Sequence, residues 1–201
     1  MAKNNGSMTV GGMVVCDAKL KSSSPYSQSR GVQSKPNEGE LPDAFEERSW
    51  RERMHVMPND EVFIPPMAVK NALSEVAKYL SESVPGKGKA TYTKHFEAGL
   101  MVIDPILLGV KASDVQGERL FVPSDGRRGG GKRVWRTFPL IPEWSGTVKI
   151  YILDPVLTGK PEKVQDYLAY AGKFIGLGRF RPRNNGFYGR FEVVSCAMSA
   201  A

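Results

Sequence analysis

The stretch Gly172-Lys-Phe-Ile-Gly-Leu-Gly-Arg-Phe-Arg-Pro-Arg-Asn-Asn-Gly-Phe-Tyr-Gly-Arg190 decides how the rest of the chain is interpreted. It holds five glycines, five basic residues and four aromatic residues, and it has no acidic residue. Glycine lets a ligand approach the backbone closely, arginine and lysine neutralise phosphates, and aromatic rings stack on bases. This composition predicts a surface that binds nucleic acid.

The glycine-rich stretch lies between a predicted helix and a predicted strand. Residues 161–171 carry apolar side chains at helical spacing, and Gly172 is placed to end that helix. Residues 190–196, Arg-Phe-Glu-Val-Val-Ser-Cys, predict a closing strand. The stretch is therefore expected to be a loop that is anchored at both ends.

The clearest helix is predicted over residues 66–81, where Pro66 suits the first turn and one apolar stripe follows at helical spacing. Strands are predicted over residues 8–16, 91–103 and 146–154 from β-branched and apolar runs. Residues 119–138 form two β-like segments around a glycine-rich tip, which predicts a protruding β-hairpin.

These elements predict a single α+β domain over residues 1–201, with insertions at 17–61 and 105–144. Without the insertions the order is βαββαβ, the ferredoxin-like (RRM-like) antiparallel sheet with two helices on one face. A short helical piece is expected inside the first insertion, around Trp50. Because strands one and four are antiparallel neighbours in this topology, Cys16 and Cys196 are expected at opposite ends of the pair, without a disulfide.

Charge and composition limit the function classes. The net charge is +7 and the isoelectric point about 9.4, with acidic residues crowded into 38–61 and basic residues gathered in the second half. A polyanionic partner is consistent with this pattern. Neither a metal site nor a cofactor fingerprint is indicated. No apolar run approaches 18 residues and the first residues lack a signal-peptide core, so we expect a cytoplasmic protein without a membrane partner.

Two short motifs resemble the signatures of the RAMP superfamily, the CRISPR-associated proteins built on ferredoxin-like, RRM-related folds. One is Phe63-Ile-Pro-Pro-Met-Ala-Val-Lys-Asn-Ala-Leu-Ser at the first helix, and the other is the run of residues 176–193 before the last strand. The resemblance implies a glycine-rich loop that lies close to RNA. It also implies a hairpin or thumb that inserts between guide and target segments, as expected of a backbone subunit.

The predicted binding residues lie in two groups. Arg179, Arg181 and Arg183 alternate, so in an extended segment they point the same way and form a row for phosphates, which position a strand without reading its sequence. The full set of candidates comprises Lys173, Arg179, Phe180, Arg181, Arg183, Phe187, Tyr188 and Arg190 in the loop, and Arg127, Arg128, Lys132, Arg133 and Trp135 in the hairpin. Of Trp135 and Phe138, one is expected to pack in the hairpin base.

The leading hypothesis is a non-catalytic protein that coats single-stranded RNA as a repeated backbone subunit of a CRISPR-type ribonucleoprotein, a homo-oligomer along the strand beside other effector subunits. One alternative is a stand-alone single-stranded DNA-binding protein of viral or mobile-element origin. Another is a metal-independent endoribonuclease that uses His95, flanked by Tyr92 and Lys94. A fourth is an assembly protein whose basic loops meet an acidic protein.

Overall fold

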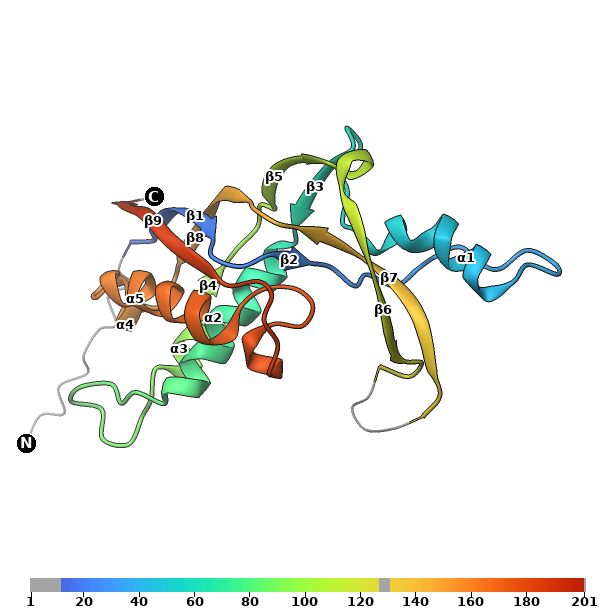
Figure 1. Cartoon of the computed structure of the whole chain (residues 1–201). Helices are drawn as coiled ribbons and strands as arrows, with labels where there is room; N and C mark the ends of the chain where they lie inside the picture. Colours follow the sequence, from blue (N-terminus) through green and yellow to red (C-terminus); the bar gives the residue numbers. More distant parts are fainter. Residues whose placement is uncertain (1–11, 127–130, 201) are drawn as a thin grey trace, which may run out of the picture.

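The largest sheet of the molecule has four antiparallel strands in the order β4-β8-β1-β9 (Figure 1). The structure is a computed structural model that describes residues 12–126 and 131–200. The strands of this sheet are β1 (Val14–Ser22), β4 (Leu100–Met101), β8 (Ser145–Ile152) and β9 (Phe191–Ala200). The first and last long strands are direct neighbours, as the sequence predicts.

Helices cover one face of this sheet (Figure 1), and they are α2 (Pro66–Leu80), α3 (Thr93–Ala98), α4 (Pro155–Thr158) and α5 (Glu162–Tyr170). The predicted helix over 66–81 is confirmed. Its apolar stripe, Val69, Ala72, Leu73, Val76 and Ala77, is buried in the core. The helix ends because Ser81 adopts a left-handed conformation, with φ of 48°.

Strand β1 begins and ends later than the sequence predicts. Residues 8–11 of the predicted strand lie outside the described residues, and the strand runs on through residues 17–22, which were expected to begin an insertion. The extension follows a period of two, because Ala18 and Leu20 are fully buried while Lys19 and Lys21 are exposed. Because this segment contains two lysines, the sequence analysis did not predict that it belongs to a half-buried strand.

The extension of β1 and β9 corrects the expectation for the cysteines. Cys16 pairs with Met198 in the ladder and Cys196 pairs with Ala18, so the two cysteines are diagonal neighbours. Their sulfur atoms lie 2.8 Å apart, and both are free thiols. The prediction that they lie at opposite ends of the strand pair is wrong, because β1 ends six residues later than predicted and β9 runs on to Ala200, so both cysteines lie inside the ladder.

The predicted strand over 91–103 is also wrong. Residues 93–98 form helix α3, and only Leu100–Met101 (β4) pairs with β8. Tyr92 and Phe96 are four residues apart and are both buried, at 1% and 0% exposure. Their helical spacing decides the conformation, although Thr91, Tyr92 and Thr93 favour strands by propensity.

A second sheet carries the hairpin, in the order β2-β7-β6. Its strands are β2 (Tyr26–Ser27), β6 (Gln116–Pro123) and β7 (Arg133–Ile141), and β6 with β7 projects from the body of the molecule (Figure 1). The predicted hairpin over 119–138 is therefore confirmed and is slightly longer. A third sheet pairs β3 (Glu61–Ile64) with β5 (Ile106–Lys111), and the short 3-10 turn η2 (Ala112–Asp114) leads from β5 to β6.

The helical piece predicted inside the first insertion is present. It consists of α1 (Pro42–Ser49) followed directly by the 3-10 turn η1 (Trp50–Arg53). Trp50 and Met54 are buried, and the turn packs beside strand β7. This piece therefore supports the base of the hairpin.

The architecture is α+β with antiparallel sheets, and it is compatible with a ferredoxin-like fold. The exact βαββαβ topology is not confirmed, because the second strand of that pattern is reduced to two residues and two further sheets are present. Within the described part of the chain, no helix is both long and apolar enough to span a membrane.

Candidate nucleic-acid interface

The glycine-rich loop is an ordered structure that folds back on itself. After α5 the chain makes a π-helical turn, η3 (Ala171–Ile175), so the prediction that Gly172 ends the helix is wrong. The loop is closed by hydrogen bonds from the Leu177 N–H to the Gly189 carbonyl, 2.9 Å, and from the Tyr188 N–H to the Phe180 carbonyl, 3.0 Å. Gly189 has φ of +77°, and an added Cβ would lie 1.8 Å from the Leu177 oxygen. Glycine at this position is therefore required for the loop to close.

The loop is also fastened to strand β2 at its base. The Arg179 N–H donates to the Ser27 carbonyl at 2.8 Å, and the Gly189 N–H donates to the Pro25 carbonyl at 2.7 Å. These bonds hold the two ends of the loop beside the second sheet, so its side chains have fixed positions.

Two side chains of the loop clamp it onto the hairpin. The Arg179 guanidinium lies 3.6 Å from the centre of the Phe138 ring, and the Tyr188 hydroxyl donates to the Glu118 carboxylate, with 2.8 and 2.9 Å to its oxygens. Glu118 and Phe138 are directly opposite each other in the β6–β7 ladder, so both contacts fall on one face. Burial and the bond to Glu118 raise the pKa of Tyr188 to about 12. We call this face of the hairpin the inner face.

The predicted row of three arginines is wrong, because the segment is not extended. Phe180 has φ of 53° and residues 182–184 form the 3-10 turn η4. Arg181 turns toward α2 and its Nη2 lies 2.7 Å from Glu75 Oε1, while Arg183 Nε lies 3.8 Å from Glu75 Oε2. Arg179 alone faces the hairpin. The loop thus divides its arginines between two environments.

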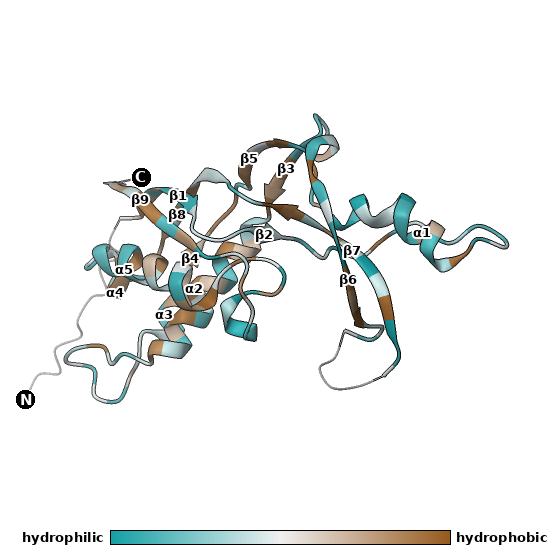
Figure 2. Cartoon of the chain, viewed as in Figure 1, coloured by the Kyte–Doolittle hydropathy of each residue, from teal (hydrophilic) through white to brown (hydrophobic). Residues whose placement is uncertain are grey.

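The opposite face of the hairpin, which we call the outer face, carries alternating aromatic and basic side chains. Phe121 and Trp135 are 46% and 47% exposed, with ring centres 5.2 Å apart. Arg119 lies 5.2 Å from the Trp135 ring and Arg133 lies 5.3 Å from the Phe121 ring. Figure 2 shows hydrophobic residues toward the free end of both strands. Trp135 is thus the exposed aromatic residue and Phe138 the packed one.

Buried residues that support the inner face were missed by the sequence analysis. The Glu46 side chain, only 5% exposed, accepts hydrogen bonds from Arg53 (3.1 Å) and Arg136 (3.0 Å) and from the backbone of Thr137 (2.6 Å). Because Arg53 and Glu46 lie in a polar insertion, their sequence context predicts solvent exposure.

The remaining predicted residues lie around this region. Lys173 is exposed on the π-helical turn, Phe187 is 57% exposed, and Lys132 is exposed near the hairpin end. Arg190 is tied to the loop, since its N–H donates to Ser24 Oγ at 2.9 Å and its Nη1 donates to the Phe187 carbonyl at 3.3 Å. Arg127 and Arg128 lie outside the described residues.

His95, the catalytic candidate, lies on helix α3 instead of a strand. Its Nδ1 is 2.9 Å from Asp154 Oδ2. Asp154 also caps α4, because it accepts hydrogen bonds from the backbone of Val156 and Leu157. Burial raises the pKa of Asp154, but the bonds from His95 and these N–H groups outweigh it, so the pKa is lowered. The pair joins helix α3 to the start of helix α4.

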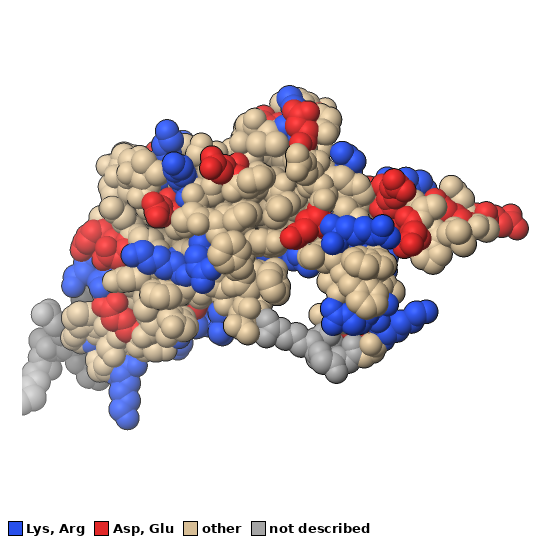
Figure 3. Space-filling view, in the orientation of Figure 1, with Lys and Arg blue, Asp and Glu red and all other residues tan. Residues whose placement is uncertain are grey.

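A hollow separates the hairpin from the body of the molecule, and Lys and Arg side chains lie along its hairpin side (Figure 3). The glycine-rich loop and the inner face meet beside it. Across residues 12–126 and 131–200, no cluster of three His, Cys, Asp or Glu residues could hold a metal ion.

The fold and this cleft define an α+β protein with a projecting hairpin clamped by a glycine-rich basic loop. Among solved structures, the chain is similar to one in the cryo-EM structure of the type III-B Cmr-beta bound to cognate target RNA. The TM-score is 0.56 at 11% identity, over 94% of this chain and 61% of that one. Cmr6 from Pyrococcus furiosus gives a TM-score of 0.49 at 14% identity, over 90% of this chain and 98% of that one.

At these identities the likeness concerns the fold. The chain spans 61% of the length of the Cmr-beta chain that it matches. No family model and no curated protein matches the sequence. The resemblance to RAMP-superfamily proteins that two motifs predicted is confirmed at the level of the fold.

Proposed function

We propose that this protein binds single-stranded RNA and coats it as a repeated subunit of a CRISPR-type ribonucleoprotein. The observation that carries the proposal is the clamp between the glycine-rich loop and the projecting hairpin, because it gathers basic and aromatic side chains from both around one cleft. Such a surface contacts phosphates and stacks on bases without reading sequence. The fold likeness to a chain of an RNA-bound Cmr-beta structure supports the same function.

The outer face supplies the stacking component of this proposal. Phe121 and Trp135 are half exposed and contact one another, so they offer ring surface at the projecting end of the hairpin. Stacking of a base on an aromatic side chain contributes about 1–3 kcal/mol. The aromatic rings of the hairpin would therefore bind bases, while the basic side chains of the loop and of the hairpin bind phosphates.

The test is binding of a fluorescent single-stranded RNA 20-mer across a salt series. A variant with Lys132→Ala, Arg133→Ala and Arg183→Ala should lose at least about tenfold in affinity. Its salt slope should fall by about 2, because each phosphate contact on a single strand contributes about 0.7. The control variant carries Lys87→Ala, Lys89→Ala and Lys160→Ala, three exposed lysines outside the loop and the hairpin. Equal affinity for all three proteins overturns the proposal.

Two further measurements separate the alternatives. Competition with a DNA strand of the same sequence distinguishes a guide-holding protein from a DNA-binding one, because RNA should compete more strongly under the proposal. Titration of strands of increasing length should show more copies of the protein on longer strands. A single copy at every length removes the coating part of the proposal and leaves binding intact.

A further inference from the structure

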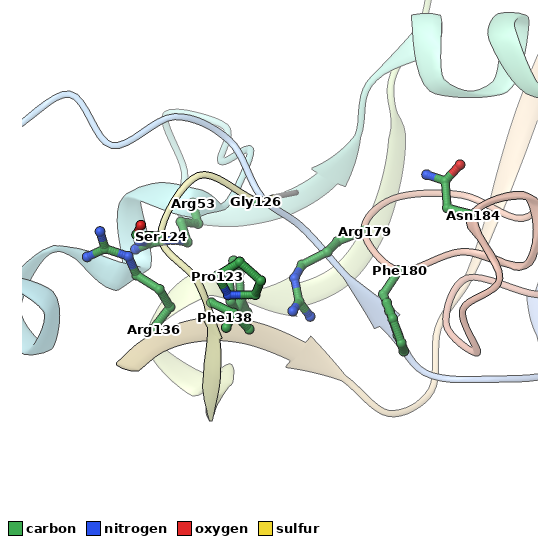
Figure 4. Close-up of a pocket in the computed structure, with 10 residues that line it drawn as sticks. Arg53, Pro123, Ser124, Gly126, Arg136, Phe138, Arg179, Phe180 and Asn184 are labelled. Carbon is green, nitrogen blue, oxygen red and sulfur yellow. The ribbon is translucent and has the colours of Figure 1, made fainter. Parts of the chain in front are cut away.

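A cavity of about 430 Å³ lies between the inner face, the turn η1 and the glycine-rich loop (Figure 4). Three arginines from three separate segments line it, Arg53 from η1, Arg136 from β7 and Arg179 from the loop. Apolar side chains form the rest of the wall, with Val122 and Pro123 on the hairpin and Phe180 on the loop. Its volume suits a group of the size of one nucleotide.

The charges around the cavity do not cancel. Arg53 and Arg136 share the carboxylate of Glu46. The Arg179 side chain makes no ion pair with any described residue, and Glu118, which attracts it, is already bonded by Tyr188. These three guanidinium groups thus have two carboxylates among their described partners. One positive charge is left in excess, which a single phosphodiester would balance.

Two of these guanidinium groups also have unused hydrogen-bond donors. The Nη1 atoms of Arg53 and Arg179 are buried, and neither has a hydrogen-bond partner among the described residues. An unsatisfied buried donor costs about 1–3 kcal/mol. The Arg53 side chain is only 10% exposed, so water does not readily replace the missing acceptor.

Phe138 holds both cations in place. Its ring centre lies 3.6 Å from the Arg179 guanidinium and 5.3 Å from that of Arg53. Burial lowers the pKa of Arg179, and the positive charge of Arg53 adds to this effect against the attraction of Glu118. Two like charges held against one ring are stabilised by an anion between or beside them.

We propose that this cavity binds one phosphate group of the nucleic acid, with Arg53 and Arg179 as its donors and Arg136 beside them. The proposal rests on the proposed function and adds a defined subsite to it. The apolar wall would contact the attached sugar or base without reading the base identity. The phosphate is either an internal phosphodiester or a terminal phosphate, because both present the same oxygens to arginine.

The experiment measures the affinity of wild type, Arg53→Met and Arg51→Met for two RNA 20-mers that differ only in a 5′-terminal phosphate. Arg51 is the matched control, since it belongs to the same turn but its guanidinium lies exposed, 4.2 Å from the Trp50 ring. Arg53→Met should weaken binding about tenfold and lower the salt slope by about 0.7. Arg51→Met should have little effect.

The two strands identify the source of the phosphate. If the terminal phosphate strengthens wild-type binding and Arg53→Met removes that gain, the cavity holds a strand end. If both strands bind wild type equally and Arg53→Met weakens both, the cavity holds an internal phosphate. Unchanged affinity in Arg53→Met while wild type binds RNA overturns the cavity proposal alone. A wild type that binds no RNA overturns the proposed function as well.

Loss of Arg53 removes one of two cations from Glu46, so the fold of each variant is checked by its unfolding midpoint. Arg179→Met provides a second test, because its guanidinium has no ion pair to lose. If Arg53→Met does not fold, Arg179→Met should still weaken RNA binding and lower the salt slope. A folded Arg179→Met with wild-type affinity overturns the proposal.

Discussion

The two faces of the β6–β7 hairpin are built in different ways. On the inner face nearly every polar group is engaged, since Glu118 is bonded to Tyr188, Phe138 is covered by Arg179, and Arg136 pairs with buried Glu46. On the outer face Phe121, Trp135 and their neighbouring arginines contact mainly each other. The inner face fixes the position of the hairpin and lines the proposed phosphate cavity, whereas the outer face leaves its aromatic side chains exposed to a ligand.

This difference implies a division between stability and binding. Substitutions on the inner face should cost folding free energy because they remove buried partners. Those on the outer face should cost little, because half-exposed rings and exposed ion pairs contribute weakly. The predictions below test that division from its largest expected effect downward.

The largest effect is expected for Glu46→Gln. The change removes the charge that two arginines share inside the hairpin base and leaves them without compensation, so the free energy of unfolding should fall by about 3 kcal/mol. The control on the outer side is Asp43→Asn. The Asp43 carboxylate is 72% exposed and lies 3.5 Å from Arg119, so the free energy of unfolding should change by no more than about 0.5 kcal/mol. Urea unfolding at pH 7 measures both. Similar losses for the two variants contradict the division of the faces.

A somewhat smaller loss is expected for Gly189→Ala in the loop that covers the inner face. Alanine at φ of +77° is strained, and its Cβ would overlap the Leu177 carbonyl, so the loss should be about 2 kcal/mol. Gly126→Ala at the hairpin end is matched in backbone, with φ of +71°, but no atom of the described residues lies within 4 Å of its added Cβ. The control should therefore lose about 1 kcal/mol or less. Equal losses would show that the loop does not pack as described.

A loss of about 1 kcal/mol is expected for Tyr188→Phe, which removes the hydroxyl bonded to Glu118. The pKa of Tyr188 is about 12 in the folded protein and about 10 when unfolded, so folding favours the protonated phenol. The stabilisation that the Tyr188 hydroxyl gives to the folded protein is complete below pH 10 and is lost as the pH rises toward 12. The difference between wild type and variant should shrink over that window. Tyr79→Phe, at a side chain 57% exposed, should match wild type throughout.

The sequence predicts the regular parts of this fold well. Helix α2 and strand β8 follow clear periods of apolar residues, and the hairpin follows two β-like runs around glycines. The second half of strand β1 and helix α3 were missed for the same reason. In each, the conformation depends on which side chains are buried by distant elements, and local propensity pointed elsewhere.

The sequence analysis located the candidate site but did not predict its geometry. The glycine-rich composition indicated the loop, yet Gly178 and Gly189 serve close packing against Ser27 and Leu177. The division of Arg179 from Arg181 depends on Glu75 and Phe138, which are more than 40 residues away in sequence. The sequence analysis did not predict a role for Arg53, because this residue is buried only when the hairpin has folded against it. Such contacts between distant segments have no local sequence signal.

The smallest effect on stability, and the most informative one for binding, is expected for Glu75→Gln. Its carboxylate pairs with Arg181 and lies near Arg183, both partly exposed, so the free energy of unfolding should change by no more than about 0.5 kcal/mol. The loop arginines then lose their only described acidic partner and compete better for phosphates, so affinity for single-stranded RNA should rise about two- to fivefold with a steeper salt slope. Glu97→Gln, which releases Lys78 on the same helical layer, is the control and should bind as wild type. If Glu75→Gln binds RNA no better than the control, Arg181 and Arg183 hold the loop in place and do not bind phosphates. The phosphate contacts are then made by Arg179 and by the basic residues of the hairpin.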